Sequence, residues 1–302
     1  MYQYQYCTAE ELMRLTKEYK LKISGIAVLH EAERQEKATA VILRQMQKTL
    51  AVMETNIRSG TVSTQSSIGG LIGKNAAAMN EYAETKNTIG GEVLSKAIAY
   101  ALAITEENAR MKKIAACPTA GASGVVPGCL MAVYEQRKLP RPALIDALFN
   151  ASAIGIIIAD NATVSGAEGG CQAEVGAASA MAASALVEMA GGDADACLNA
   201  AAMALKNVLG LVCDPVAGLV EVPCSKRNAM GAANAIAAAD MACAGIKSVI
   251  PLDEVVQAMK EVGMALPFKL KETAKGGVAN SRTAKELRVK IEQSTKEYLG
   301  NH

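Results

Sequence analysis

Three of the eight cysteines lie in turns marked by glycine or proline, and these are the residues best suited to chemistry. They are Cys171 in the stretch GGCQ, Cys213 in VCDP and Cys224 in VPCS. Turns suit thiolate ligands because nearby backbone amides stabilise the charge and tune a bound metal. A free cysteine is more commonly a small core hydrophobe, so spacing alone leaves both interpretations open. The other five lie mostly in helical patterns: Cys7, Cys117, Cys129, Cys197 and Cys243.

The composition argues against catalytic centres that depend on histidine. The only two histidines are His30 and His302, so a histidine-based metal site or a Ser-His-Asp triad is close to excluded. No basic and apolar export signal is visible at the N-terminus, which predicts a cytoplasmic protein. Cytosolic thiols are kept reduced, so we expect metal binding or core packing for the cysteines instead of disulfides.

A turn at Pro118–Gly124 is the candidate site for an anion. It carries the hydroxyls of Thr119 and Ser123 and exposes backbone amides just before an expected helix, where negative charge is favoured. An ordinary turn between helices has the same composition. Lys74 and Arg227 are candidate counter-charges for a substrate carboxylate, although a lone cation is usually a solvated surface residue.

The elements that must position these residues are predicted to be helices. Thr8 and Glu11 form a capping-box pattern at the start of a helix from Thr8 to Tyr19. Apolar residues then recur at helical spacing from Ile26 to Ile57, which predicts one long amphipathic helix that ends near Gly60. The Ser-, Thr- and Gly-rich stretch from Thr61 to Lys74 is expected to be a loop.

The rest of the chain also favours helices. The pattern resumes near Asn75, and the region Glu92–Glu135 reads as two helices separated by the Cys117–Gly124 break. Beyond Pro142 the chain is rich in alanine, which favours closely packed helices. The segment Ile154–Ile158 fits a buried helix as well as a strand. We therefore predict an all-α fold, with residues 1–302 forming a single helical domain.

Composition excludes two broad classes of partner. Lys and Arg total 31 against 30 for Asp and Glu, and tryptophan is absent, so nucleic-acid binding is not expected. The most apolar stretches, Ala143–Ala159 and Ala229–Ile246, are interrupted by Asp and Asn residues. We interpret them as buried helices and expect no membrane association.

Several motifs together resemble one enzyme family. SGAEGGCQAEVGAASAMAA (Ser165–Ala183) and CDPVAGLVEVPCSKRNA (Cys213–Ala229) resemble the α subunit of the iron–sulfur-dependent bacterial L-serine dehydratases. The resemblance extends to PTAGASGVVPG (Pro118–Gly128) and ETAKGGVA (Glu272–Ala279), with a weaker match at SSIGGLIGKN (Ser66–Asn75). It thus covers most of the chain from Ser66 to Ala279.

This resemblance implies a cofactor and a reaction. In the family, three cysteines hold a 4Fe-4S cluster, and the motifs carry that role to Cys171, Cys213 and Cys224 alone. Three ligands leave one iron open, whereas electron-transfer clusters usually have four cysteines. The open iron would act as a Lewis acid on the hydroxyl of L-serine. Loss of the α-proton and the hydroxyl then yields pyruvate and ammonia without pyridoxal phosphate.

The general base is missing from this picture. His30 lies in an amphipathic pattern far from every motif, and we expect it to be an exposed helical residue. The carboxylates of Glu168, Glu174 and Asp214 lie beside the ligands, where they could equally serve as hydrogen-bond partners. Single-chain relatives carry a second domain, for which this chain has no room. The resemblance therefore implies a separate β subunit that contributes to the active site.

Two other functions remain open at the level of sequence. An open iron would also bind a thiol or a secondary hydroxyl, so a related lyase acting on L-cysteine or L-threonine is one alternative. The other is a non-enzymatic helical scaffold or redox sensor whose cysteines hold zinc or a labile cluster.

Overall fold

The described part of the chain is built from helices. The computed structural model describes the backbone of residues 3–300 and the side chains of residues 3–293, so His302 and the first two residues lie outside this range. Within it there are no strands beyond two isolated bridges, which confirms the predicted all-α fold. The helices are α1 (Ala9–Tyr19), α2 (Ile23–Arg34), α3 (Thr39–Gly60), α4 (Asn75–Glu84), α5 (Gly91–Ala109), α6 (Val125–Arg137), α7 (Arg141–Asn161), α8 (Gly166–Gly169), α9 (Ala177–Met189), α10 (Ala194–Lys206), α11 (Cys224–Cys243), α12 (Leu252–Ala265) and α13 (Arg282–Gly300).

The N-terminal helices confirm one prediction and correct another. Helix α1 begins with the predicted capping box, in which Thr8 and Glu11 each accept a backbone N–H from the other. The single long helix was wrong, because α2 ends at Arg34 and α3 starts only at Thr39. Glu36 has a φ of 52°, and this left-handed conformation cannot continue a right-handed helix. The periodicity persists because both helices present apolar faces to one core.

His30 is buried, which corrects the expectation of an exposed helical residue. Only 7% of it is accessible, and its Nδ1 lies 3.1 Å from the carbonyl oxygen of Tyr4. Its ring also packs against the ring of Tyr6, with 4.6 Å between centroids. The cause is the N-terminal segment, which folds back over α2 and covers the histidine. The periodicity of one helix does not reveal that a separate segment packs over it.

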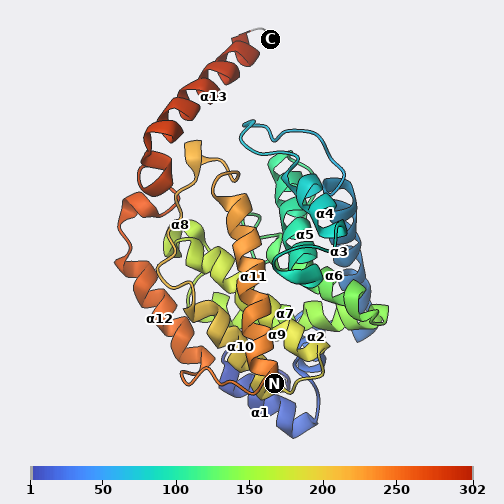
Figure 1. The fold of residues 1–302 in the computed structure, drawn as a ribbon. Coiled ribbons are helices and arrows are strands. Elements are labelled where there is room, and N and C mark those ends of the chain that lie inside the picture. The colour runs from blue at the N-terminus through green and yellow to red at the C-terminus, as the bar shows by residue number, and fades with distance from the viewer. Residues whose placement is uncertain (1–2, 301–302) are drawn as a thin grey trace.

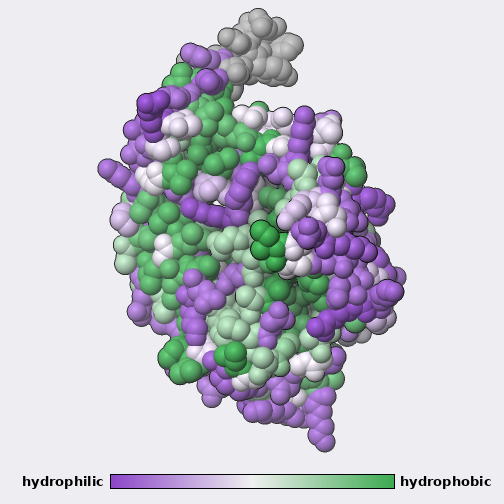
Figure 2. All heavy atoms as spheres, viewed as in Figure 1, coloured by the Kyte–Doolittle hydropathy of each residue, from purple (hydrophilic) through white to green (hydrophobic). Residues whose placement is uncertain are grey.

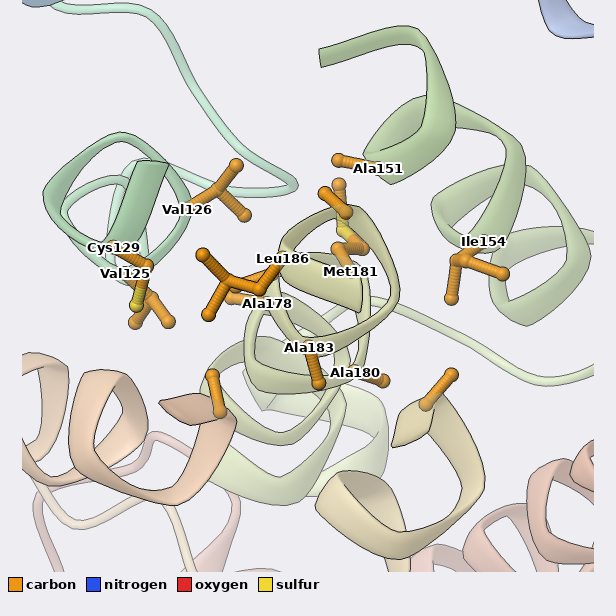
Figure 3. Packing of buried hydrophobic residues seen from close by; sticks show 14 of the residues in the cluster. Val125, Val126, Cys129, Ala151, Ile154, Ala178, Ala180, Met181, Ala183 and Leu186 are labelled. Carbon is orange, nitrogen blue, oxygen red and sulfur yellow. The ribbon is translucent and has the colours of Figure 1, made fainter. Parts of the chain in front are cut away.

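Helix α9 forms the centre of the core. Its residues from Ala177 to Glu188 are all buried, and it packs against α6, α7, α10 and α11. Figure 3 shows Ala178, Ala180 and Ala183 on its surface, with Val126 of α6 and Ile154 of α7 facing it. Alanine leaves little bulk between helices, so the neighbouring backbones approach closely. The ambiguous segment Ile154–Ile158 is therefore helical and lies within α7.

Close helix packing depends on glycine at position 128. A Cβ atom there would lie 2.9 Å from both the nitrogen of Ala101 and the carbonyl oxygen of Ala97 in α5. We expect Gly128→Ala to destabilise the fold by about 2 kcal/mol, because about 3 kcal/mol of overpacking outweighs about 1 kcal/mol of helix propensity. Urea unfolding followed by circular dichroism measures this. Gly25→Ala in α2 is the matched control, since its Cβ would meet nothing closer than 3.4 Å and should be neutral or stabilising.

The last helix stands apart from the helical core. In Figure 1, α13 extends away from the core at the end opposite α1, and α12 runs along one side. Figure 2 shows apolar surface along this side of the molecule. Among the described residues, one helix, α7, is long and apolar enough to cross a membrane, and 61% of its most apolar window is buried inside the protein.

Candidate metal centre

The segment that carries Cys171 is locked in place by its neighbours. Gly170 has a φ of 78°, and a Cβ there would meet the carbonyl oxygen of Leu211 at 2.8 Å. Gln172 begins a short π-helix, η1 (Gln172–Gly176), a feature often found at functional sites. Its side chain is fully buried, donates to the carbonyl of Met259 at 2.9 Å and accepts from the amide of Gly210 at 2.9 Å. Cys171 therefore sits on a rigid turn.

Cys213 is held by its backbone. Its amide donates to the carbonyl of Leu270 at 2.8 Å, and its carbonyl accepts from the amide of Glu272 at 2.7 Å. An isolated parallel bridge pairs Cys213 with Lys271, so the start of the ETAKGGVA stretch, at Glu272, lies directly beside this cysteine. Asp214, which is 2% exposed, accepts from the amide of Val278 at 2.6 Å and fastens the same segment.

Cys224 is the first residue of α11, and Arg227 follows one turn later on the same helix. The Arg227 guanidinium forms an ion pair with Asp214 at 2.8 Å and donates to the carbonyl of Val212 at 2.7 Å. Its positive charge is also near enough to Cys171 to counter the rise in the pKa of that thiol, which burial causes. Arg227 therefore joins all three cysteine segments.

The three thiols lie close together in one region, called the cysteine space below, where Cys171 and Cys213 are buried and Cys224 is half-buried. Burial raises the pKa of Cys171 to about 11 and that of Cys224 to about 12. The pKa of Cys213 is raised further, first by burial and then by the charges of Glu174 and of the other two cysteines. This mutual effect places the three sulfur atoms within electrostatic reach of one another. Because such thiols keep their protons at neutral pH, metal binding has to release them.

Glu174 lies at the edge of this space. Its Oε1 accepts from the Thr119 hydroxyl at 2.7 Å, and its Oε2 lies 3.8 Å from the sulfur of Cys213. Burial raises the pKa of this carboxyl above its usual range. A Cβ at Gly121 would lie 2.8 Å from the carboxylate, and one at Gly166 would lie 2.6 Å from it and 3.1 Å from the Cys213 sulfur. The two glycines leave the room that Glu174 occupies.

The turn at Pro118–Gly124 is tied to α11 by Asn228. This fully buried amide donates to the carbonyl of Gly121 at 2.7 Å and accepts from the amide of Gly124 at 3.0 Å. The amides of residues 119–122 form no hydrogen bond with the rest of the described chain. Ser123 is fully buried, and its hydroxyl donates to the carbonyl of Ala120 at 2.8 Å. The backbone of this turn therefore supplies donors, whereas the Ser123 side chain stabilises the turn itself.

The donor set suits a cluster better than a single ion. Among the described residues, no three His, Cys, Asp or Glu side chains are close enough to hold one metal ion. The three thiols nevertheless lie near enough to influence one another's ionisation, with the Arg227 cation beside them. An iron–sulfur cluster binds its thiolates through separate iron atoms, so its ligands stand farther apart than those of one ion. Three thiols beside a cation therefore form a donor set whose chemistry fits such a cluster.

Comparisons with known proteins identify the family of this chain. The family model for the serine dehydratase alpha chain matches residues 18–279. The chain belongs to the serine dehydratase alpha chain family. A probable L-serine dehydratase alpha chain of Bacillus subtilis is 50% identical over 282 residues, covering 93% of this chain and 94% of that protein. The L-serine dehydratase alpha chain of Peptoniphilus asaccharolyticus is 42% identical over 281 residues, covering 93% and 96%.

A longer relative has the same family region as part of its chain. The L-serine dehydratase of Streptomyces coelicolor is 38% identical over 286 residues, which covers 91% of this chain but only 61% of that protein. The remaining part of the longer protein has no counterpart in the aligned region. Proteins of the serine dehydratase alpha chain type therefore occur both with and without this additional part.

The structure brings together some of the predicted site residues of this chain and separates others. Thr119 and Arg227 lie at the cysteine space, as described above. Lys74 is exposed, caps α4 in a left-handed conformation, and forms no described contact with Thr119 or the three cysteines. Glu168 is exposed and accepts from the Thr163 hydroxyl at 2.6 Å. The substrate-binding roles of Thr119, Ser123, Lys74 and Arg227 stay predictions.

Sequence reasoning missed the residues that hold the site together. Gln172 and Asn228 each connect segments far apart in the chain, and both are fully buried. Both residues lie inside the motif stretches quoted above, but no role was predicted for them. The spacing of residues in a sequence does not reveal that a buried amide bridges two loops. A polar residue within an otherwise small, apolar stretch is the one signal that could have pointed to them.

Proposed function

We propose that this chain is the α subunit of an iron–sulfur L-serine dehydratase, a lyase that converts L-serine to pyruvate and ammonia. The observation that carries the proposal is the convergence of Cys171, Cys213 and Cys224, from three separate segments, on one buried space beside Arg227. The 42% identity to a protein named an L-serine dehydratase alpha chain supports the choice of substrate.

We assign the three cysteines as the ligands of a 4Fe-4S cluster. When bound, the cluster supplies an iron without a protein ligand, which acts as a Lewis acid toward the serine hydroxyl. The charge of Arg227 acts on Cys171 and would offset part of the negative charge that three thiolates bring. The buried amides of Gln172 and Asn228 fix the ligand segments, so the thiolates need little rearrangement to bind.

The turn at Pro118–Gly124 is proposed to bind the serine carboxylate. Its amides at residues 119–122 have no partner in the described chain, and they lie next to Glu174 at the cysteine space. The Thr119 hydroxyl donates a hydrogen bond to Glu174, so its oxygen can still accept one from the serine ammonium group. The turn orients the substrate, and the Glu174 carboxylate keeps Thr119 in place.

We propose that the active enzyme contains a β subunit and works in the cytoplasm, where thiols stay reduced. The longer Streptomyces relative, of which this chain matches 61%, supports the need for an additional part. Met264, Phe268 and Val278 are large apolar side chains with 66%, 70% and 45% of their surface exposed. They flank the segment that pairs with Cys213, so a subunit that covered them would also reach the cysteine space. Residues 1–302 act as a single domain in this proposal.

Anaerobic reconstitution tests the proposed function. The chain is loaded with iron and sulfide, mixed with the β subunit, and assayed for pyruvate from L-serine. We expect turnover that is lost on exposure to air or a chelator and restored at least in part by iron and reductant, because the iron without a protein ligand is the easiest to oxidise and remove.

Parallel assays on L-cysteine and L-threonine separate the related lyases from the proposed one. A reconstituted complex that keeps full activity for hours in air with a chelator would contradict an open-iron site. A chain that binds zinc or a labile cluster but releases no pyruvate in any arm would instead be a scaffold or redox sensor.

A further inference from the structure

Glu221 is a buried carboxylate in the turn between Cys213 and Cys224. It is only 3% exposed, and no cation pairs with it among the described side chains. A buried carboxylate is costly unless hydrogen-bond donors replace its water. Three donors do so here, and all belong to one distant loop. The Ser67 hydroxyl donates to Oε2 at 2.6 Å, the Leu71 amide to Oε2 at 3.0 Å and the Gly69 amide to Oε1 at 2.8 Å.

The loop that binds Glu221 is the Ser-, Thr- and Gly-rich segment at residues 61–74, called the 61–74 loop below. Inside it, the Ser67 amide donates to the carbonyl of Ile72 at 2.9 Å, and the Ser67 hydroxyl oxygen accepts from the amide of Ile72 at 3.2 Å, which closes a tight turn. At its base, the guanidinium of Arg110 donates twice to the carbonyl of Gln65, at 2.8 and 3.1 Å. The conformation of this turn is therefore fixed by bonds within the loop, whereas its position in the protein is fixed by Glu221.

Gly69 shows how closely the loop approaches. A Cβ at this position would clash with the side chain of Leu219 and lie 2.8 Å from Oε1 of Glu221. Only a residue without a side chain allows the loop backbone to reach the carboxylate. The contact between the 61–74 loop and the turn 219–221 is therefore specific in shape as well as in hydrogen bonding.

The backbone of Glu221 connects the same contact to a cluster ligand. Its carbonyl accepts from the amide of Ser225 at 3.1 Å, in the first turn of α11, which begins at Cys224. One turn further along, Asn228 holds the proposed carboxylate-binding turn at Pro118–Gly124. The N-terminal end of α11 thus carries both loops, one through Glu221 and one through Asn228.

We propose that Glu221 is a positioning residue for serine binding, which fixes the 61–74 loop beside the cysteine space so that the loop forms one wall of the substrate site. This inference rests on the proposed serine dehydratase function. The loop suits that role because it offers small residues, hydroxyls and amides to a small polar substrate. The described bonds that fix the cysteine segments involve Gln172, Leu270 and Arg227 and no loop residue, so a loosened loop leaves the cluster ligands in place.

Replacing Glu221 with glutamine tests whether this carboxylate anchors the 61–74 loop. In either orientation of the amide, its NH₂ group faces a backbone N–H of Gly69 or Leu71, so one buried donor loses its partner. In the cluster-loaded complex with the β subunit, we expect the KM for L-serine to rise about tenfold, with kcat changed by less than about threefold. Iron content and visible absorbance should match those of the unmodified complex.

Ser67→Ala provides a second variant in case Glu221→Gln folds poorly. It removes the shortest of the three bonds and keeps the carboxylate, and we expect a smaller rise in KM of the same kind. Glu188→Gln is the matched control, because Glu188 is also a buried carboxylate, 6% exposed, that accepts from Ser24 and Asn150 away from the site. Its KM should stay unchanged.

Hydrogen exchange of the peptide covering residues 61–74 gives a readout that is independent of turnover. Faster exchange in Glu221→Gln than in Glu188→Gln, together with the raised KM, supports the proposal. Exchange as slow as in the unmodified chain overturns the anchor, and a loosened loop with unchanged KM overturns its role in serine binding. An equal loss of iron and kcat also overturns it, since Glu221 would then serve the cluster. If the unmodified complex releases no pyruvate, the proposed dehydratase function is wrong. Hydrogen exchange then still shows whether Glu221 anchors the 61–74 loop.

Discussion

Serine in place of Cys171, Cys213 or Cys224 is expected to strip the reconstituted complex of most of its iron and of all measurable pyruvate formation. A hydroxyl is a far poorer ligand for iron than a thiolate, and with three protein ligands there is no spare cysteine to compensate. The three thiols lie together in the cysteine space, so each variant removes one of three equivalent ligands. Iron per chain, measured after desalting under anaerobic conditions, decides the outcome.

Two cysteines outside this space provide the controls. Cys243 is exposed, so Cys243→Ser should keep its iron and change the free energy of unfolding by less than about 0.5 kcal/mol. Cys197 is 1% exposed, and a hydroxyl there should cost about 1–3 kcal/mol of stability while iron per folded chain stays the same. Full iron in any of the three ligand variants would remove that cysteine from the proposed ligand set.

The cluster-loaded chain alone should turn over L-serine at least about a hundredfold more slowly than the complex with its β subunit. Elimination requires removal of a weakly acidic α-proton, and general-base assistance typically contributes about 10²- to 10⁴-fold. His30 cannot supply it from its place between Tyr4 and Tyr6. Pyruvate release from the loaded chain, measured with and without the β subunit at equal iron content, tests this prediction.

Equal rates with and without the β subunit would mean that the base belongs to this chain. The structure then reduces the candidates for the base among the three carboxylates that the sequence suggested. Glu168 is exposed and bonded to Thr163, and Asp214 is engaged by Arg227 and Val278. Glu174 alone lies at the cysteine space, so Glu174→Gln would be the next variant, with loss of kcat at retained iron as the expected result.

Local features of the fold could be predicted from the sequence because they arise between residues that are close in the chain. The capping box at Thr8, the break before Val125 and the loop before Asn75 all follow from side-chain preferences over a few positions. The same rules failed between Arg34 and Thr39, where two helices share one apolar face and the periodicity continues across the break.

Candidate ligands could also be chosen from the sequence, because turn positions and motif resemblance pointed to three of the eight cysteines. That choice said nothing about how the three sulfurs approach one another. Their shared space depends on bonds such as those of Gln172 to Met259, 87 residues away, and of Asn228 to Gly121, 107 residues away. Such contacts exist only once the helices have packed.

Residue identity alone therefore determined the kind of chemistry: soft thiolate ligands, a small-residue helical core and a loop able to approach a ligand. Only the tertiary structure decided which side chains position that chemistry. Arg227 serves the cysteine segments, Ser123 closes its own turn, and Glu221 binds a loop 154 residues away. The physical reason is burial: a polar group removed from water must find its partner wherever packing brings one, and neighbours in sequence do not reveal where that is.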